Sequence, residues 1–208
     1  SISHLDLQRF FHRALNRTGL PIAWTQGFNP HPILSFGSAL ALGWTSEYEI
    51  LDVKLSAPMG RSRIEFAKRV AGPVDPPMLE VRIVADQHPA PMAMVRASDY
   101  EITLSGETAA ATLAAAEVFL RRESVMAVRK TKSGEREVDI RPMALLLERK
   151  GDVLSARLML TEKDTLKPDL LVRALAEIAG AEVPEMRIHR RCLLGEDESG
   201  ALKPLMEL

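Results

Sequence analysis

The sequence has a single cysteine, Cys192, among its 208 residues. One thiol excludes an internal disulfide, and it also excludes an iron–sulfur cluster or a cysteine-based zinc site held by this chain alone. The sequence also lacks any run of about 18 or more apolar residues, and no positively charged start leads into an apolar segment. We therefore expect neither a membrane span nor a secretory signal, and the cytoplasm is the expected compartment.

Excess charge and aromatic side chains are also scarce. The formal net charge is -1, so the whole protein exerts no overall attraction on nucleic acid, and a polyanion site would need local clustering of cations. Aromatic residues make up 5% of the chain, which leaves few stacking partners for bases. Hydrophobic residues make up 46%, enough for one or two ordinary cores.

The first half of the chain shows a helix followed by extended runs. Ser3 is the expected N-cap, Asp6 completes a capping-box spacing, and Gly19 and Pro21 end the helix. The residues expected to face the core at helical spacing are Leu7, Phe10, Phe11, Ala14 and Leu15. Strands are predicted over 22–24, 33–42 and 49–55, then a helix over 61–71 and a strand over 79–84.

The second half repeats this order of elements. Strands are predicted over 100–104, 125–128, 137–147, 153–160 and 186–190, with helices over 107–122 and after Pro168. Pro89 and Pro91 mark 86–98 as an irregular linker with a boundary near residue 95. The expected fold is α+β, with two ferredoxin-like (βαββαβ) domains in tandem over 1–92 and 93–208. The opening strand of the first domain is missing or reduced to residues 1–2, which suggests a truncated N-terminus.

The segment 25–32 is the most distinctive part of the chain. Pro30 and Pro32 fix their own φ angles and hold Asn29 and His31 near extended geometry, while Gly27 permits a sharp turn. Side chains on so rigid a loop lose little entropy on binding. The pattern is typical of a recognition or active-site loop and equally of a loop that only connects strands.

The candidate site combines this loop with the first helix and one later arginine. The predicted catalytic residues are His4, Asp6 and His31, and the predicted substrate-binding residues are Arg9, Arg13, Arg17, Gln26, Phe28, Asn29 and Arg141. A neutral imidazole at the helix start can accept a proton, although a solvent-facing residue is an equal alternative there. Asp6 also fits a purely structural capping role, and the spacing of His4, Asp6 and His31 matches no familiar metal-ligand pattern. We expect neither a metal nor a cofactor.

Basic residues form three clusters. The first is the stripe of Arg9, Arg13 and Arg17 with His12 beside it, which fits a phosphate backbone or an ordinary solvated helix face. The other two comprise Arg129, Lys130, Lys132, Arg136 and Arg141 on a strand-turn-strand, and Arg187, His189, Arg190 and Arg191 near the end. The aromatic residues Trp24, Phe28, Phe36 and Trp44 are expected around the rigid loop, where they pack a core or stack on bases.

Several motifs resemble a known bacterial family. They are Ser3-His4-Leu5-Asp6-Leu7, the helix 10–17, Leu20-Pro21, Gln26-Gly27-Phe28-Asn29-Pro30-His31-Pro32, Ser35-Phe36, Leu42-Gly43, Glu47-Tyr48-Glu49, Val138-Asp139-Ile140-Arg141-Pro142 and Lys167-Pro168-Asp169-Leu170-Leu171. Together they resemble the radical-SAM-linked family of proteins of unknown function. The resemblance implies a module fused to, or encoded beside, radical SAM enzymes, with genes often near those of ribosomal proteins and ribonucleases.

Three functions are compatible with these features. The first is a non-catalytic module that binds RNA or a ribosome-related substrate for a radical SAM partner, because one cysteine cannot hold the cluster that radical chemistry needs. The second is a metal-independent RNA-processing enzyme with His4 or His31 as acid or base. The third is a protein–protein adaptor whose loop docks on the partner enzyme.

Overall fold

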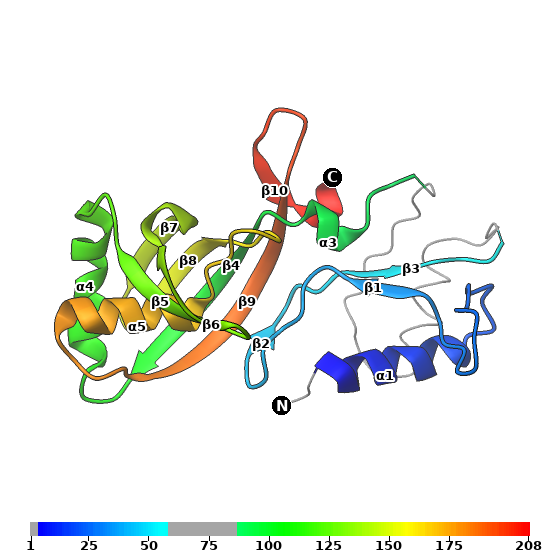
Figure 1. The fold of residues 1–208 in the computed structure, drawn as a ribbon, viewed down its shortest axis with the longest axis horizontal. Coiled ribbons are helices and arrows are strands. Elements are labelled where there is room, and N and C mark those ends of the chain that lie inside the picture. The colour runs from blue at the N-terminus through cyan, green and yellow to red at the C-terminus, as the bar shows by residue number, and fades with distance from the viewer. Residues whose placement is uncertain (1–3, 58–86) are drawn as a thin grey trace. The chain divides into compact units, whose positions relative to one another are not determined.

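The computed structural model describes residues 4–57 and 87–208, with the backbone alone for 4–8 (Figure 1). It is a mixed α+β structure that divides into two compact units. Unit 1 comprises Ser1–Gly43 and Ile50–Met94, and unit 2 comprises Trp44–Glu49 and Val95–Leu208. The predicted Ser3 cap, opening strand, helix over 61–71 and strand over 79–84 lie outside the described residues. No helix in the described part of the chain is long and apolar enough to cross a membrane.

Unit 1 contains helix α1 (His4–Asn16), strands β1 (Leu34–Phe36) and β3 (Leu51–Val53), and the short helix α3 (Pro91–Met94). Strands β1 and β3 pair antiparallel, with Phe36 opposite Leu51. Helix α1 turns Leu15 into the core, where this side chain is 2% exposed, and Phe11 meets Phe36 edge-to-face at 6.0 Å. The core of unit 1 therefore includes the inner face of α1.

The prediction that Phe10 faces the core is wrong, because its side chain is 55% exposed. Successive residues in an α-helix are rotated by about 100°, which separates Phe10 from Leu15 by about 140° and Phe11 from Leu15 by only about 40°. Phe10 instead touches Phe11 edge-on at 5.4 Å. The apolar stripe of α1 is narrower than the count of apolar residues indicates.

The extended runs of unit 1 form less sheet than predicted. The run over 22–24 contributes only two isolated bridges, Ile22 with Leu55 and Trp24 with Pro32, and the run over 33–42 is a strand only from Leu34 to Phe36. Gly37 follows directly, and glycine weakens a strand interior. The linker prediction over 86–98 is also wrong in part, because α3 lies within it and the next strand begins at Ala97.

Unit 2 contains a six-stranded sheet in the order β10-β9-β4-β8-β7, with β2 paired to β9. The strands are β2 (Thr45–Ser46), β4 (Ala97–Ser105), β7 (Ala144–Lys150), β8 (Val153–Met159), β9 (Glu185–Glu196) and β10 (Leu202–Pro204). All pairings are antiparallel except that between β2 and β9. Residues 44–49, which the sequence predicts as part of the first domain, therefore lie in unit 2, and Thr45 and Ser46 among them form a strand of its sheet.

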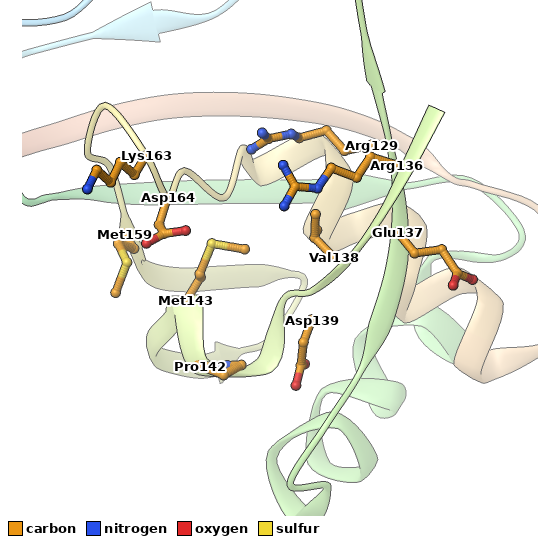
Figure 2. Close-up of a pocket in the computed structure, with 10 residues that line it drawn as sticks. All are labelled: Arg129, Arg136, Glu137, Val138, Asp139, Pro142, Met143, Met159, Lys163 and Asp164. Carbon is orange, nitrogen blue, oxygen red and sulfur yellow. The ribbon is translucent and has the colours of Figure 1, made fainter. Parts of the chain in front are cut away.

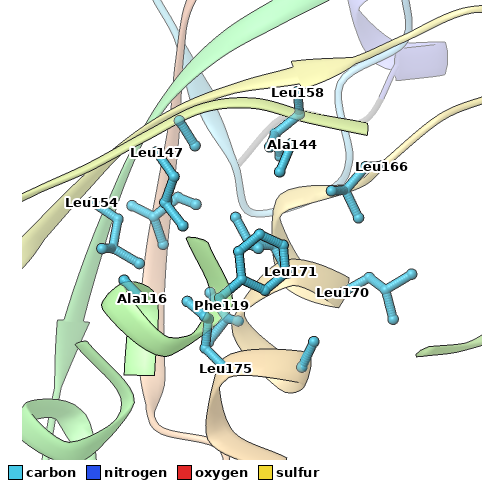
Figure 3. Packing of buried hydrophobic residues seen from close by; sticks show 14 of the residues in the cluster. Ala116, Phe119, Ala144, Leu147, Leu154, Leu158, Leu166, Leu170, Leu171 and Leu175 are labelled. Carbon is cyan, nitrogen blue, oxygen red and sulfur yellow. The ribbon is translucent and has the colours of Figure 1, made fainter. Parts of the chain in front are cut away.

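Helices α4 (Ala109–Arg121) and α5 (Pro168–Ala179) pack against each other and cover one face of the sheet (Figure 1). Strand β8 alternates buried and half-buried residues, which directs Leu154 and Leu158 toward Phe119 and Leu171 in the core (Figure 3). Fully burying one such side chain stabilises the fold by about 1.5–3 kcal/mol. The predicted entry of a helix through Pro168 is confirmed, with Pro168 in its first turn.

A separate hairpin of β5 (Met126–Thr131) and β6 (Gly134–Asp139) lies in the chain between α4 and β7. The single strand predicted over 137–147 is wrong, because the 3₁₀ turn η1 (Arg141–Met143) separates β6 from β7. Pro142 cannot donate a ladder hydrogen bond, and the Asp139 carboxylate accepts the N–H groups of Val125 and Arg141 at 2.9 and 3.1 Å. A second 3₁₀ turn, η2 (Leu205–Glu207), follows β10.

Candidate functional site

The proline-bounded loop of unit 1 is closed upon itself through Thr25. The backbone N–H of Thr25 donates to the His31 carbonyl oxygen at 2.9 Å, and the His31 N–H donates to Thr25 Oγ1 at 3.1 Å. Gly27 has φ +140°, a conformation that favours glycine, and Phe28 beside it is fully exposed. The loop therefore presents Phe28 at its tip on a backbone that is fixed at its base.

The imidazole of His31 has a defined orientation. Its Nδ1 lies 3.1 Å from the carbonyl oxygen of Asn29 and 3.2 Å from Thr25 Oγ1. In the tautomer that carries its proton on Nδ1, the ring donates to the Asn29 carbonyl oxygen, which can only accept a hydrogen bond. The lone pair then resides on Nε2, and this atom is the one available for proton transfer.

The ring of His31 stacks on the ring of His12 from helix α1. The centroids are 5.6 Å apart and the planes differ by 23°. Partial burial, followed by the nearby His31, lowers the pKa of His12 below its ordinary value. The contact joins the loop to α1, and it places two imidazoles, one of them favoured in the neutral form, side by side.

The predicted catalytic set is only partly described. His4 and Asp6 lie at the start of α1, and their side chains lie outside the described residues. His4 precedes His12 by eight residues, which is about 12 Å along the helix axis. The partner that the structure gives His31 is therefore His12, a residue that the sequence analysis noted only as a neighbour of the arginine stripe. The sequence feature that could have identified His12 as a site residue is its position three residues after Arg9, on the side of α1 away from Phe10.

The arginine stripe lies next to this imidazole pair. Arg9 and Arg13 are exposed on α1, and Arg17 is exposed one residue beyond the end of the helix. His12 precedes Arg13 in the chain and follows Arg9 by nearly one turn, so the three share one side of the helix. Gln26 and Asn29 of the loop are also exposed. We refer below to Arg9, His12, Arg13, Arg17 and residues 25–32 as the helix–loop surface.

Arg141 belongs to unit 2, where it has a structural environment. Its guanidinium donates to the carbonyl oxygens of Arg122 at 3.1 Å, Leu120 at 3.2 Å and Ala144 at 3.4 Å. The guanidinium also lies over the Phe119 ring, 5.5 Å from its centroid. Arg141 thus caps the carboxyl end of α4, where carbonyl groups lack helical partners.

The third basic cluster is also engaged within unit 2. Arg190 is buried and its Nη1 lies 3.2 Å from Glu49 Oε1, while Arg191 Nε lies 2.8 Å from Glu47 Oε1. His189 Nδ1 lies 2.7 Å from Thr45 Oγ1. These contacts attach residues 44–49 to β9, so His189, Arg190 and Arg191 serve the fold, while Arg187 is exposed.

The expectation that four aromatic residues surround the loop is wrong for Trp44. Trp44 belongs to unit 2, where its ring meets Tyr100 edge-to-face at 6.2 Å. Phe36 is buried in the core of unit 1, while Trp24 and Phe28 are exposed. Trp24 and Phe28 are therefore the most exposed of these four aromatic residues.

Comparison with known proteins identifies the chain at the level of a family. No curated protein and no solved structure matches it. A family model described as "Uncharacterized protein conserved in bacteria" matches residues 1–168, a range that includes α1, the loop and most of unit 2. The chain belongs to this bacterial family, DUF2344.

Proposed function

We propose that this chain is a cytoplasmic recognition module that binds single-stranded RNA, free or in a ribosome-related substrate, and presents it to a partner radical SAM enzyme. The stacking of His12 on His31 carries the proposal, because this contact brings the rigid loop to the arginine stripe. With one thiol, the chain leaves any radical chemistry to the partner.

Local charge supports binding of a polyanion. Residues 7–46 contain Arg9, Arg13 and Arg17 and no aspartate or glutamate, although the whole chain has a formal net charge of -1. Phosphate groups can approach exposed guanidinium groups, and the release of condensed cations then favours association. The fully exposed ring of Phe28 offers a face on which one base can stack.

We also propose a ferredoxin-like fold for unit 2, and a second such domain in unit 1. In unit 2 the elements β4, α4, β7, β8, α5 and β9 follow the βαββαβ order, and β9-β4-β8-β7 is an antiparallel array of the fourth, first, third and second of these strands. The β5–β6 hairpin is then an insertion.

Salt-dependent binding tests the RNA proposal. A labelled single-stranded RNA of about 12 nucleotides is titrated at several KCl concentrations and followed by fluorescence anisotropy. Each phosphate contact contributes about 0.7 to the slope of log K against log salt, so the R13Q/R17Q variant should lower this slope by about 1.4. Phe28→Ala should weaken binding by about 5-fold to 100-fold at every salt concentration without changing the slope.

The matched control is R121Q/R187Q, which removes two exposed arginines from unit 2. Its binding curve should overlay that of the native protein. Equal effects of R13Q/R17Q and the control would refute the helix–loop surface as the RNA site. Failure to bind RNA, together with salt-insensitive association with the radical SAM enzyme, would identify a protein–protein adaptor instead.

The imidazole stack favours a second candidate function, metal-independent cleavage of the bound RNA. Neutral His12 would accept the proton of a ribose 2′-hydroxyl, and the 2′-oxygen would then attack the adjacent phosphorus. The bond from phosphorus to the 5′-oxygen breaks, a 2′,3′-cyclic phosphate forms, and protonated His31 gives its proton to the leaving oxygen. His12 takes the place in this scheme that the sequence analysis gave to His4.

This candidate predicts that His12→Gln and His31→Gln each abolish cleavage at protein concentrations that saturate the RNA. DNA of the same sequence should remain intact, because it lacks the attacking 2′-hydroxyl. The products are separated by gel electrophoresis. Intact RNA after prolonged incubation with the native protein would exclude cleavage and leave recognition as the function.

A further inference from the structure

An open hollow of about 440 Å³ lies in unit 2, on the side of the β5–β6 hairpin that faces the loop between β8 and α5 (Figure 2). Ligand pockets in proteins have volumes of a few hundred cubic ångströms. The side chains around this hollow include Arg129 and Arg136 from the hairpin, Lys163 and Asp164 from the loop, and Met143 and Met159. None of these residues belongs to the helix–loop surface.

The two arginines of the hairpin form a like-charge pair. Arg129 and Arg136 are direct partners in the antiparallel register, so their side chains project from the same face, and Figure 2 shows both guanidinium groups on the hollow side. Two positive charges directly opposite each other destabilise a strand pair. The next pair, Lys130 and Glu135, is complementary and lies on the other face. An anion between the two arginines would remove the repulsion.

The opposite wall of the hollow is a tightly closed loop. Thr161 Oγ1 donates to the Asp164 carbonyl oxygen at 3.0 Å and accepts the Asp164 N–H at 2.9 Å. Thr165 Oγ1 donates to the Thr161 carbonyl oxygen at 2.7 Å. These bonds fix the backbone of Lys163 and Asp164 at the rim. Arg129 Nη1 approaches the same loop, 3.5 Å from the Thr165 carbonyl oxygen.

Three carboxylates line the hollow beside the three cations. Only one of these carboxylates both faces the hollow and accepts no hydrogen bond from the residues that the structure describes. Asp139 accepts two backbone N–H groups, and the bond from Val125 is the main reason that its pKa is lowered. Glu137 points away from the two arginines, on the far side of strand β6 (Figure 2). The Asp164 carboxylate remains, across the hollow from Arg136 and next to the thioether side chains of Met143 and Met159.

We propose that this hollow binds a nucleoside monophosphate. The phosphate lies between Arg129 and Arg136, with Lys163 completing the positive charge around it. Asp164 accepts a hydrogen bond from a ribose hydroxyl, and the base rests on the polarizable surface of Met143 and Met159. This site is independent of the RNA surface proposed above.

Isothermal titration calorimetry of the full chain with AMP, adenosine and inorganic phosphate tests this assignment. AMP should bind at least about tenfold more tightly than adenosine or inorganic phosphate, because AMP makes both the charged and the apolar contacts. Arg136→Gln should weaken AMP binding by about tenfold or more. The control Lys130→Gln removes the same charge from the other face of the same hairpin and should leave AMP affinity unchanged.

Two further measurements test the contact of Asp164 with the ribose and the repulsion between Arg129 and Arg136. Asp164→Asn should weaken AMP and leave inorganic phosphate unaffected or bound more tightly. The ligand-free Arg136→Gln variant should unfold at the same temperature as the native protein or above it, because the like-charge pair is gone. Equal affinity for AMP and phosphate, or equal AMP affinity of the Arg136→Gln and Lys130→Gln variants, would overturn the assignment. The R13Q/R17Q variant should bind AMP normally, so failure of the RNA proposal leaves this result interpretable.

Discussion

The ion pair between Arg190 and Glu49 offers a direct test of how residues 44–49 stabilise unit 2. The Arg190 side chain is 2% exposed, its Nη1 lies 3.2 Å from Glu49 Oε1, and its guanidinium carbon lies 6.0 Å from the Tyr100 ring centroid. Glu49→Gln removes the negative charge of this carboxylate and leaves the buried guanidinium in place. Breaking a buried pair in this way costs about 3–5 kcal/mol.

The expected loss for Glu49→Gln lies below that range. The Glu49 side chain is 29% exposed, so water screens part of the attraction, and we expect a loss of about 2–3 kcal/mol in the free energy of unfolding. For a unit of about 120 residues, this corresponds to a decrease in melting temperature of roughly 8–12 °C.

Urea unfolding followed by tryptophan fluorescence measures this loss. Trp24 lies in unit 1 and Trp44 in unit 2, so a Trp24→Phe background makes the emission report on unit 2 alone. The control is Glu148→Gln, because Glu148 and Lys150 form a 3.7 Å ion pair with both side chains 67% exposed, and such pairs contribute about 0–1 kcal/mol. Replacing both partners of the buried pair, as Arg190→Met with Glu49→Leu, should recover much of the lost stability. A Glu49→Gln variant as stable as the Glu148→Gln control would refute this account.

Three other residues allow independent tests. Arg141→Lys should destabilise unit 2 by about 2 kcal/mol, measured by the same urea titration, because an ammonium group cannot reproduce the planar set of bonds to three carbonyl oxygens; a loss below about 0.5 kcal/mol would contradict the capping role. Burial is the largest cause that raises the pKa of Cys192 to about 11. Its alkylation by iodoacetamide at pH 8 should therefore be about a hundredfold slower in the folded than in the unfolded protein. Equal rates would show that the thiol is exposed to solvent. The pKa of His12 is lowered in the folded state, so the unfolded chain binds the proton more readily and stability should decrease as the pH falls below about 6.5. In an NMR titration His31→Gln should raise the His12 pKa, and an unchanged value would argue against the stacked pair.

Local sequence signals located most elements of unit 2. Strand β8 was predicted over 153–160 because its apolar residues alternate, and the structure has Val153–Met159. Pro168 marked the start of α5. The turn at Arg141–Met143 was missed because the alternating residues Val138 and Ile140 are followed, across Pro142, by the apolar run 143–147, and together they were read as one strand. The hydrogen bonds of Asp139 show where the strand is interrupted.

The candidate site depended more on contacts that sequence does not encode locally. The rigidity of the loop was predictable from Pro30, Pro32 and Gly27, but the stack of His31 on His12 joins residues 19 positions apart in the chain. Arg141 was predicted to bind substrate and Arg190 was named in a basic cluster, because a charge count does not show which arginines contact carbonyl groups or a glutamate. Only the folded structure shows which groups each arginine contacts, and these contacts distinguish an exposed arginine from an engaged one.

The passage of residues 44–49 into the sheet of unit 2 has a practical consequence for dividing this protein. The polypeptide enters unit 2, returns to unit 1 at Ile50 and leaves it again after Met94, so one proteolytic cut cannot separate two complete halves. A fragment expressed from Val95 onward would lack β2, one of the three strands that pair with β9, and would expose the Tyr100 ring and the Arg190 side chain to solvent. Such a fragment should aggregate or melt early, and adding a synthetic peptide of residues 44–49 should rescue it in trans.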